Sequence, residues 1–305
     1  MQRIRYDDRV AIVTGAGSGL GRDYAKFLAS RGAKVLVNDL GSGYNDQQRS
    51  ASPAQQVVDE IRAAGGQAVA NHASVANWDE AQSIVRDCLD AFGTVDIVVN
   101  NAGILRDKSF CKMSVDDFLL VHQVHLMGAY YVTRAAFPTL RDKAYGRVVL
   151  TTSTSGLFGV FGQTNYSAAK LGLVGFMNAL KQEGQRHNIL VNAVAPLAFT
   201  RMSELTGFFS EEAGAFLKPE LVTPLVAFFC SEQCDRNGDI IAAGGGYFAK
   251  VEIMEGHGLR FDPNSELSPE MIAERYNQIS DMSRGRSFAS ANQHIQAALG
   301  PQAPR

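Results

Sequence analysis

The chain has 305 residues, of which 46% are hydrophobic and 20% charged, and its formal net charge is −2. This composition supports a large buried core and excludes global disorder. Lysine and arginine are scattered along the chain, which argues against a nucleic-acid-binding face. No apolar run approaches the roughly 20 residues of a membrane span. Neither nucleic acid nor a membrane is expected as a partner.

The two ends of the sequence carry no targeting signal of a known type. Residues 1–8 lack a signal-peptide core, and residues 302–305 do not form a Ser-Lys-Leu type peroxisomal signal. A cytoplasmic location is therefore the expectation. The four cysteines are too few and too widely spaced for a disulfide framework, and no histidine or second cysteine pair completes a zinc site. No metal is expected.

Strand-like and helix-like segments alternate along the first 250 residues. The apolar runs expected to form strands are residues 10–14, 34–39, 67–71, 97–100, 147–152 and 190–195. The segments expected to form helices are residues 21–31, 57–64, 78–92, 115–140 and 163–183. This alternation predicts a Rossmann-like, doubly wound parallel α/β sheet of about seven strands with helices on both faces.

The sequence changes in character after about residue 250. Residues 251–263 are irregular, whereas residues 268–279 and 285–299 have helical patterns, the first with a Ser-Pro-Glu start. We expect one domain over residues 1–250, which holds the cofactor-binding and catalytic motifs. A helical C-terminal extension over residues 251–305 is expected to pack on that domain or on a neighbouring subunit.

The first expected strand ends in a glycine-rich turn, Thr14-Gly-Ala-Gly-Ser-Gly-Leu-Gly21, directly before a helix. Such a turn lets the backbone approach a pyrophosphate at the helix N-terminus. Asp39 ends the second strand, where a carboxylate accepts hydrogen bonds from ribose hydroxyls and repels a 2′-phosphate. Neither Ser18 nor Leu40 offers a cation for that phosphate. NAD is therefore the expected cofactor, in preference to NADP.

Tyr166 and Lys170 lie four residues apart in an expected helix, so their side chains share one face. An ammonium beside a phenol favours the phenolate. Lowering the tyrosine pKa from about 10 to about 7 requires about 4 kcal/mol of preferential stabilisation. Lys170, helped by a cationic cofactor ring, is expected to supply it. Taken alone the pair is weak evidence, because tyrosine and lysine often share helix faces.

Together these motifs resemble the short-chain dehydrogenase/reductase family. The matching segments are residues 14–21, Asn100-Asn-Ala-Gly103, Ser153, Tyr166-xxx-Lys170 and Pro196, in family order over residues 8 to about 250. The resemblance implies that Tyr166 is the general acid/base and that Ser153 steadies the substrate oxygen. It implies that Lys170 binds the nicotinamide ribose. The cofactor-binding residues that it implies are Gly15, Ser18, Gly19, Leu20, Asp39, Ala73, Ser74, Asn101, Ala102, Gly103, Tyr166, Lys170, Pro196, Ala198, Phe199 and Thr200.

Within that family, the chain is similar to the (3R)-hydroxyacyl-CoA dehydrogenase domains of peroxisomal multifunctional enzymes of type 2. Residues 101–107, 132–136, 161–172 and 217–220 carry this likeness. It implies NAD-dependent oxidation of a (3R)-3-hydroxyacyl-CoA to the 3-ketoacyl-CoA. The alternatives are a hydroxysteroid or steroid side-chain hydroxyacyl-CoA dehydrogenase, a 3-oxoacyl-thioester reductase and a non-catalytic dinucleotide sensor. Intact Ser153, Tyr166 and Lys170 argue against the sensor.

Three positions depart from the family pattern. His125 stands where many members have an asparagine that holds a proton-relay water, and it is either an altered relay or a core histidine. Ala73 replaces the aspartate that commonly follows the third strand, which leaves Ser74 and the backbone to meet the adenine. Leu197 replaces the glycine after Pro196.

The expected partner is a small molecule, an acyl-CoA by the resemblance. Arg106, Lys108 and Lys112 follow the Asn-Ala-Gly turn and are either cations for CoA phosphates or an ordinary basic loop. Relatives commonly associate through the helices near residues 115–140 and 163–183, so a homodimer or homotetramer is expected by analogy.

Overall fold

A computed structural model describes residues 3–41, 52–199, 211–262 and 264–299. The contacts divide the chain into two compact units, Met1–Lys250 and Val251–Arg305. Among the described residues, no helix is long and apolar enough to cross a membrane. No group of three metal-ligating side chains occurs in these ranges either.

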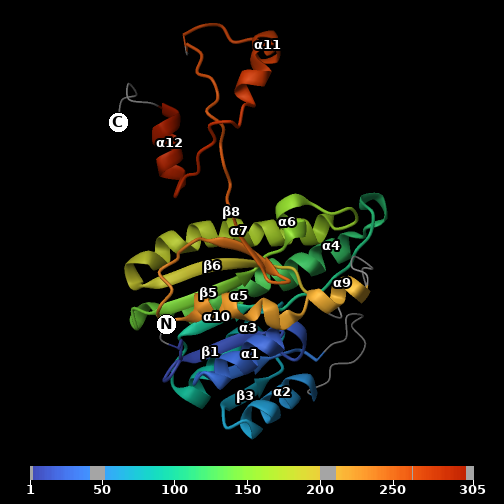
Figure 1. Ribbon diagram of the computed structural model, residues 1–305, viewed down its shortest axis with the longest axis vertical. Helices are drawn as coiled ribbons and strands as arrows, with labels where there is room; N and C mark the ends of the chain where they lie inside the picture. Colours follow the sequence, from blue (N-terminus) through green and yellow to red (C-terminus); the bar gives the residue numbers. More distant parts are fainter. Residues whose placement is uncertain (1–2, 42–51, 200–210, 263, 300–305) are drawn as a thin grey trace. The chain divides into compact units, whose positions relative to one another are not determined.

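The first unit is built on an eight-stranded sheet with the order β3-β2-β1-β4-β5-β6-β7-β8 (Figure 1). The six ladders that join β1 to β7 are all parallel. The fold class predicted from the sequence is confirmed, and β8 at the sheet edge brings the count to eight. The strands are β1 (Val10–Thr14), β2 (Lys34–Asn38), β3 (Gln67–Asn71), β4 (Ile97–Asn100), β5 (Gly146–Thr151), β6 (Ile189–Pro196), β7 (Ile240–Gly244) and β8 (Tyr247–Val251).

Helices cover both faces of the sheet. One layer contains α1 (Gly19–Ser30), α2 (Ser52–Ala63) and α10 (Thr223–Cys230), and the other contains α3 (Trp78–Phe92), α5 (Gly128–Asp142) and α7 (Thr164–Gly184). The central strands β1, β4 and β5 are buried along their whole length, which fits their continuous apolar sequences. Shorter elements are η1 (Phe110–Lys112), α6 (Thr154–Phe158), η3 (Gln185–His187), α9 (Glu211–Phe216) and η4 (Pro219–Leu221).

The long helix expected over residues 115–140 is interrupted. It consists of α4 (Val115–His122), a π-helical turn η2 (Gln123–Met127) and α5. The apolar pattern alone does not distinguish a continuous helix from one with an inserted residue. Such π-helical turns are rare overall, and those that occur are often found at functional sites.

The second unit contains α11 (Pro269–Ile279) and α12 (Ala291–Leu299). Their bounds are close to those predicted from the sequence, residues 268–279 and 285–299. Ser268 caps α11 by accepting a hydrogen bond from Met271 N at 3.3 Å. An antiparallel bridge joins Glu255 and Arg286 within this unit. Several large apolar side chains of the unit are exposed, among them Leu267, Tyr276 and Ile295. Its packing against the domain or a neighbouring subunit stays a prediction.

Candidate active site

The site lies at the carboxyl ends of the central strands. β1 and β4 are neighbours in the sheet, although the chain runs from β1 outward to β2 and β3 before it returns to β4. Doubly wound sheets bind ligands at such a reversal of strand order. The glycine turn follows β1, the Asn-Ala-Gly turn follows β4 and Ser153 follows β5. The fold therefore gathers the predicted motifs at one edge of the sheet.

Ser153, Tyr166 and Lys170 come together at the end of β5. Ser153 is the N-cap of α6 and accepts a hydrogen bond from Ser155 N at 3.1 Å. Its hydroxyl also lies close enough to the Tyr166 phenol to lower the pKa of that tyrosine. Lys170 Nζ lies 5.5 Å from the centroid of the Tyr166 ring. The same ammonium donates to the carbonyl oxygen of Thr151 at 2.5 Å, which fixes the lysine against the end of the strand.

Burial controls the protonation of Tyr166 and Lys170. It raises the pKa of Tyr166 to about 12, while the hydrogen bond from Ser153 acts in the opposite direction and the Asp107 carboxyl adds to the rise. It lowers the pKa of Lys170 to about 7. These side chains alone therefore do not bring the tyrosine pKa near neutrality, because burial disfavours both charges. The further stabilisation expected from a cationic cofactor ring is needed.

His125 lies in the π-helical turn η2 with its ring against Tyr166. Its Nε2 is 3.0 Å from Ile104 N and 2.8 Å from Ile104 O. Its side chain is buried, and this burial, reinforced by the nearby Lys170, holds the pKa of His125 well below its usual value. The ring is therefore a neutral imidazole, with one nitrogen tied to the segment that follows the Asn-Ala-Gly turn.

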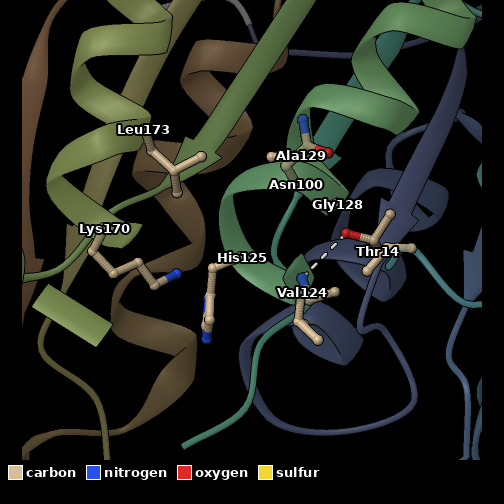
Figure 2. Close-up of a pocket in the computed structure, with 10 residues that line it drawn as sticks. Thr14, Asn100, Val124, His125, Gly128, Ala129, Lys170 and Leu173 are labelled. Carbon is tan, nitrogen blue, oxygen red and sulfur yellow. Dashed lines mark hydrogen bonds between the residues drawn. The ribbon is translucent and has the colours of Figure 1, made fainter. Parts of the chain in front are cut away.

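A small cavity of about 10 Å³ separates His125 and Lys170 from the end of β4. Figure 2 shows the Lys170 amino group directed toward the His125 ring. His125 Nδ1 and Asn100 Oδ1 are buried without a hydrogen-bond partner among the described residues, and both residues line this cavity. A cavity of this size accommodates about one water molecule, which needs two to four polar partners. The lining supplies such partners.

The glycine turn leads into the N-terminus of α1 at Gly19, with φ of 60° at Gly15 and 54° at Gly19. These positive φ values favour glycine. A Cβ at Gly15 would also lie 2.7 Å from Ala102 Cα, so the turn packs tightly on the Asn-Ala-Gly segment. Ser18 is the N-cap but makes no side-chain cap hydrogen bond. The amides of the first turn, at Gly19 and Leu20, are therefore suited to a pyrophosphate.

Asp39 stands directly after β2 and borders the same turn. Its Oδ2 accepts a hydrogen bond from Gly17 N at 2.8 Å, and its Oδ1 accepts one from Gly41 N at 2.8 Å. Each carboxylate oxygen keeps a second lone pair for a ribose hydroxyl. Its position beside the glycine turn fits the predicted adenosine ribose site.

The side chain of Asn101 has a structural role in the turn. Its Nδ2 donates to Thr14 O and to Gly15 O, both at 3.0 Å. Thr14 Oγ1 accepts from the backbone amides of Asn101 and Ala102 at 3.0 and 3.1 Å. These bonds hold the ends of β1 and β4 together, so Asn101 shapes the floor of the dinucleotide site. Its own amide group is already occupied.

The remaining predicted cofactor residues lie around the same edge. Ser74 N donates to Glu80 Oε2 at 2.7 Å, and Ala73 O accepts from Asn38 Nδ2 at 2.9 Å, so both belong to an ordered turn after β3. Pro196 ends β6, and Phe199 N donates to Leu217 O at 2.6 Å. Ala198 packs against the hydrophobic core. Thr200 lies outside the described residues.

Two residues beside the tyrosine are not foreseen from the sequence. Gln163 Nε2 donates to Asp107 Oδ2 at 2.6 Å, and the Asp107 carboxyl acts electrostatically on Tyr166. Gln163 could have been noticed three residues before Tyr166, on the same helical face. Asp107 carries no such local signal. In the basic loop, Arg106 Nε lies 3.8 Å from Asp117 Oδ1, while Lys108 is exposed.

With this geometry established, comparison with known proteins assigns the family. Residues 9–211 match the family model described as short chain dehydrogenase. The chain belongs to the short chain dehydrogenase family. A short-chain type dehydrogenase/reductase of Mycobacterium tuberculosis is 50% identical over 276 residues, which is 90% of this chain and 95% of the relative.

Larger enzymes of the family are also similar to the chain. The peroxisomal multifunctional enzyme type 2 of Drosophila melanogaster is 45% identical over 290 residues, covering 94% of this chain and 48% of the relative. This chain therefore spans about half the length of that protein. Its full-length structure superposes with a TM-score of 0.82 at 38% identity, over 97% of this chain and 49% of that one.

A third neighbour carries a dinucleotide in its solved structure. A 7α-hydroxysteroid dehydrogenase complexed with NADH and 7-oxo glycochenodeoxycholic acid superposes with a TM-score of 0.71 at 27% identity, over 79% of this chain and 95% of that one. The predicted family and the resemblance to type 2 multifunctional enzymes are both confirmed. A nicotinamide dinucleotide is the cofactor class of this family.

Proposed function

We propose that this protein is an NAD-dependent dehydrogenase that oxidises a (3R)-3-hydroxyacyl-CoA to the 3-ketoacyl-CoA. The observation that carries the proposal is Ser153 beside Tyr166, with Lys170 one turn further along α7 and its Nζ 5.5 Å from the centroid of the tyrosine ring. The names of the multifunctional relatives support the choice of substrate. The alignment with the Drosophila enzyme covers 94% of this chain. It therefore includes most of the residues after position 250.

The catalytic roles follow from the chemistry of each side chain. Tyr166 as the phenolate removes the proton of the substrate hydroxyl, and Ser153 donates a hydrogen bond to the same oxygen and holds it in place. Lys170 binds the nicotinamide ribose and stabilises the phenolate. The bound nicotinamide ring supplies the hydride acceptor. The protein contributes position and electrostatics, which place the reacting carbon at the correct distance.

The preference for NAD is part of the proposal and depends on Asp39. A carboxylate beside Gly17 accepts the ribose hydroxyls and repels a 2′-phosphate. The glycine turn at residues 15–20 holds the pyrophosphate. Ala73, Ser74, Ala102 and Gly103 would border the adenosine half, and Pro196, Ala198 and Phe199 would flank the nicotinamide.

His125 is proposed as part of the proton path. A water in the cavity beside Lys170 would receive hydrogen bonds from the lysine and meet His125 Nδ1 and Asn100 Oδ1, which otherwise have no partner. A neutral imidazole both donates and accepts through its two nitrogens. This arrangement favours an altered relay over a histidine that only fills the core.

Assembly and location are proposals as well. Residues 1–250 would act as the catalytic domain, with residues 251–305 as an extension that packs on it or on a neighbouring subunit of a dimer or tetramer. Lys108 and Lys112, both exposed, are suited to CoA phosphates. The cytoplasm stays the predicted location, whereas several relatives carry peroxisomal names.

A hydroxysteroid is the second candidate substrate. The solved neighbour with 7-oxo glycochenodeoxycholic acid favours it, because that steroid enzyme shares the fold over 79% of this chain. A reductase of acyl-carrier-protein thioesters is a further alternative, since such an enzyme of Synechocystis is 40% identical over 188 residues. The predicted NAD preference argues against the reductase.

The deciding experiment is a substrate panel. Purified protein is assayed for NAD reduction with (3R)- and (3S)-3-hydroxyacyl-CoAs of several chain lengths and with hydroxysteroids. We expect turnover with the (3R) series and none with the (3S) series. Turnover of a steroid without turnover of any (3R) substrate would replace the proposal by the second candidate.

A further inference from the structure

A half-buried carboxyl and a buried amide lie against each other beside the proposed catalytic tyrosine. Gln163 Nε2 donates to Asp107 Oδ2 at 2.6 Å, and Gln163 is only 5% exposed. The other oxygen of each group, Asp107 Oδ1 and Gln163 Oε1, is buried and has no hydrogen-bond partner among the described residues. Two polar atoms without partners on one hydrogen-bonded pair need a physical explanation.

The protonation state of Asp107 supplies that explanation. If the carboxyl is ionised, Asp107 Oδ1 and Gln163 Oε1 are both acceptors, and neither has a hydrogen to share. If the carboxyl is protonated at Oδ1, that oxygen can donate to Gln163 Oε1. The acid and the amide then form a cyclic pair with two hydrogen bonds, which satisfies both atoms at once.

We propose that Asp107 is held as a neutral carboxylic acid in a cyclic pair with Gln163, and that this pair positions Tyr166 without placing a negative charge beside its phenolate. Asp107 is thus a positioning residue that acts through Gln163. Its role in turnover rests on the function proposed above. The protonation state itself does not depend on that function.

The backbone around the pair supports a positioning role. Lys108 N donates to Gly162 O at 2.9 Å, and Asn165 Nδ2 donates to Arg106 O at 3.0 Å. These bonds, together with the acid–amide pair, join the segment after β4 to the first turn of α7. Gln163 is the N-cap of α7 but makes no side-chain cap hydrogen bond, because its amide is directed to Asp107. Tyr166 follows on the same helical face.

The surroundings favour the neutral acid. Burial raises the pKa of Asp107, and the hydrogen bond from Gln163 acts against that rise. The charged and titratable groups on the neighbouring elements include Arg106 and Lys108 on its own segment, Asp117 on α4, His125 on η2, and Tyr166 and Lys170 on α7. Arg106 Nε is 3.8 Å from Asp117 Oδ1. An ionised Asp107 raises the pKa of Tyr166, so the two groups oppose each other's ionisation.

Carbon-13 NMR of the aspartate carboxyls measures the protonation directly. The Asp107 resonance is assigned through its backbone correlations in the full-length protein, which requires neither a variant nor turnover. We expect the Asp107 carboxyl to remain protonated at the pH of the activity assay, where ordinary aspartates are ionised. An Asp107 resonance that reports an ionised carboxylate at that pH would overturn the proposal, and it would do so whether or not the protein oxidises a hydroxyacyl-CoA.

Asp107→Asn tests the consequence for Tyr166. The asparagine amide can form both hydrogen bonds with Gln163 and carries no charge, so it imitates the neutral acid. We expect the tyrosine-dependent rise of kcat/KM with pH to keep its midpoint. A shift of that midpoint to lower pH would mean that the wild-type carboxyl is ionised, and the proposal would fail.

Gln163→Met removes the amide that accepts the proposed hydrogen bond from the protonated Asp107 carboxyl. Without the positioning pair, we expect kcat/KM to fall by roughly tenfold, while the midpoint of its pH profile stays in place because loss of the Gln163 hydrogen bond does not favour ionisation of Asp107. Wild-type kinetics in this variant would contradict the pair. Asp116→Asn is the matched control, because it removes an exposed carboxylate of α4 and should leave the profile unchanged. If no alcohol is oxidised by the wild type, the proposed function fails, while the NMR titration still decides the pair.

Discussion

The His125 imidazole stands edge-on to the Tyr166 ring, with the ring centroids 5.1 Å apart and the planes at 90°. The histidine also lines the small cavity that reaches Lys170. A neutral ring in this place packs against Tyr166 and leaves Nδ1 without a hydrogen-bond partner among the described residues. Like the asparagine of the family pattern, it can both donate and accept a hydrogen bond, with one donor and one acceptor nitrogen.

Two substitutions of His125 distinguish a role in a proton relay from a role in core packing. His125→Asn restores a polar side chain, and we expect it to keep kcat/KM within about tenfold of wild type. His125→Leu keeps the bulk and removes both nitrogens, and we expect a loss of roughly 10²-fold, the lower range for a proton-transfer group. Steady-state kinetics of both purified variants checks this. Equal, near-normal rates for the two variants would reduce His125 to a core residue.

Tyr166→Phe removes the phenol oxygen and little else. Because the phenol is the proposed acid/base beside Ser153 and phenylalanine carries no proton to exchange, we expect turnover to fall by at least about 10³-fold. Binding of the dinucleotide should change little, since Lys170 and the glycine turn remain. Calorimetric titration with NAD, alongside the alcohol assay, measures the two effects separately. A variant that turns over normally would contradict the assignment of Tyr166 as acid/base.

The features that could be predicted from the sequence are those determined by residues that lie near one another along the chain. Continuous apolar runs bounded by glycine turns predict β1, β2, β4 and β5. A strand that is buried on both faces of a sheet is apolar at successive positions instead of at alternate ones, so such a run marks the strand. Fixed spacings place Ser153, Tyr166 and Lys170 at the end of β5. Each of these features depends on residues that are close in the sequence, the longest spacing being the 17 positions from Ser153 to Lys170.

The less predictable part depends on contacts between distant segments. The π-helical turn at His125 is invisible in a pattern that reads as one helix over residues 115–140. Asp107 meets Gln163 across 56 positions, and no periodicity relates the two. The tyrosine pKa is likewise shifted first by burial, then by Ser153 and Asp107, and not by the residue four positions away. Spacing gives the identity of the partners, whereas tertiary packing decides their charge states.

Asp39 should determine the choice between NAD and NADP. Asp39→Asn keeps the size of the side chain and removes the charge that repels a 2′-phosphate. We expect the ratio of kcat/KM for NAD over NADP to fall by roughly tenfold, about 1.4 kcal/mol. Because Oδ1 and Oδ2 also hold Gly41 N and Gly17 N, thermal unfolding should accompany the assay. A wild-type preference for NADP would refute the role given to this carboxylate.

Lys170 should make stability depend on pH. Burial lowers its pKa to about 7, from about 10.4 for an ordinary lysine. Between these values the unfolded chain holds a proton that the folded protein has lost, so stability rises with pH by about 1.4 kcal/mol per unit at most. Above about pH 10 the raised pKa of Tyr166 has the opposite effect.

Urea unfolding of the wild type and of Lys170→Met, without added cofactor, tests this dependence. The stability of the wild type relative to the variant should increase from about pH 7 to about pH 9.5. It should be flat below about pH 6, where both states of the wild type hold the proton. If the difference in stability between the wild type and Lys170→Met stays constant over this whole pH range, Lys170 is charged in the folded protein.

Gly103 is required by the histidine next to it. A Cβ at this position would overlap Cε1 of His125 and lie 3.0 Å from Nδ1, and the ring is held in place by Ile104. We expect Gly103→Ala to lower the free energy of unfolding by about 1–3 kcal/mol, the usual cost of overpacking a tight site. In a His125→Ala background the added methyl group has room, so the same substitution should cost less than about 0.5 kcal/mol. Urea unfolding of the four proteins of this cycle measures the coupling. An equal penalty in both backgrounds would mean that Gly103 is constrained by the backbone of its turn and not by the imidazole.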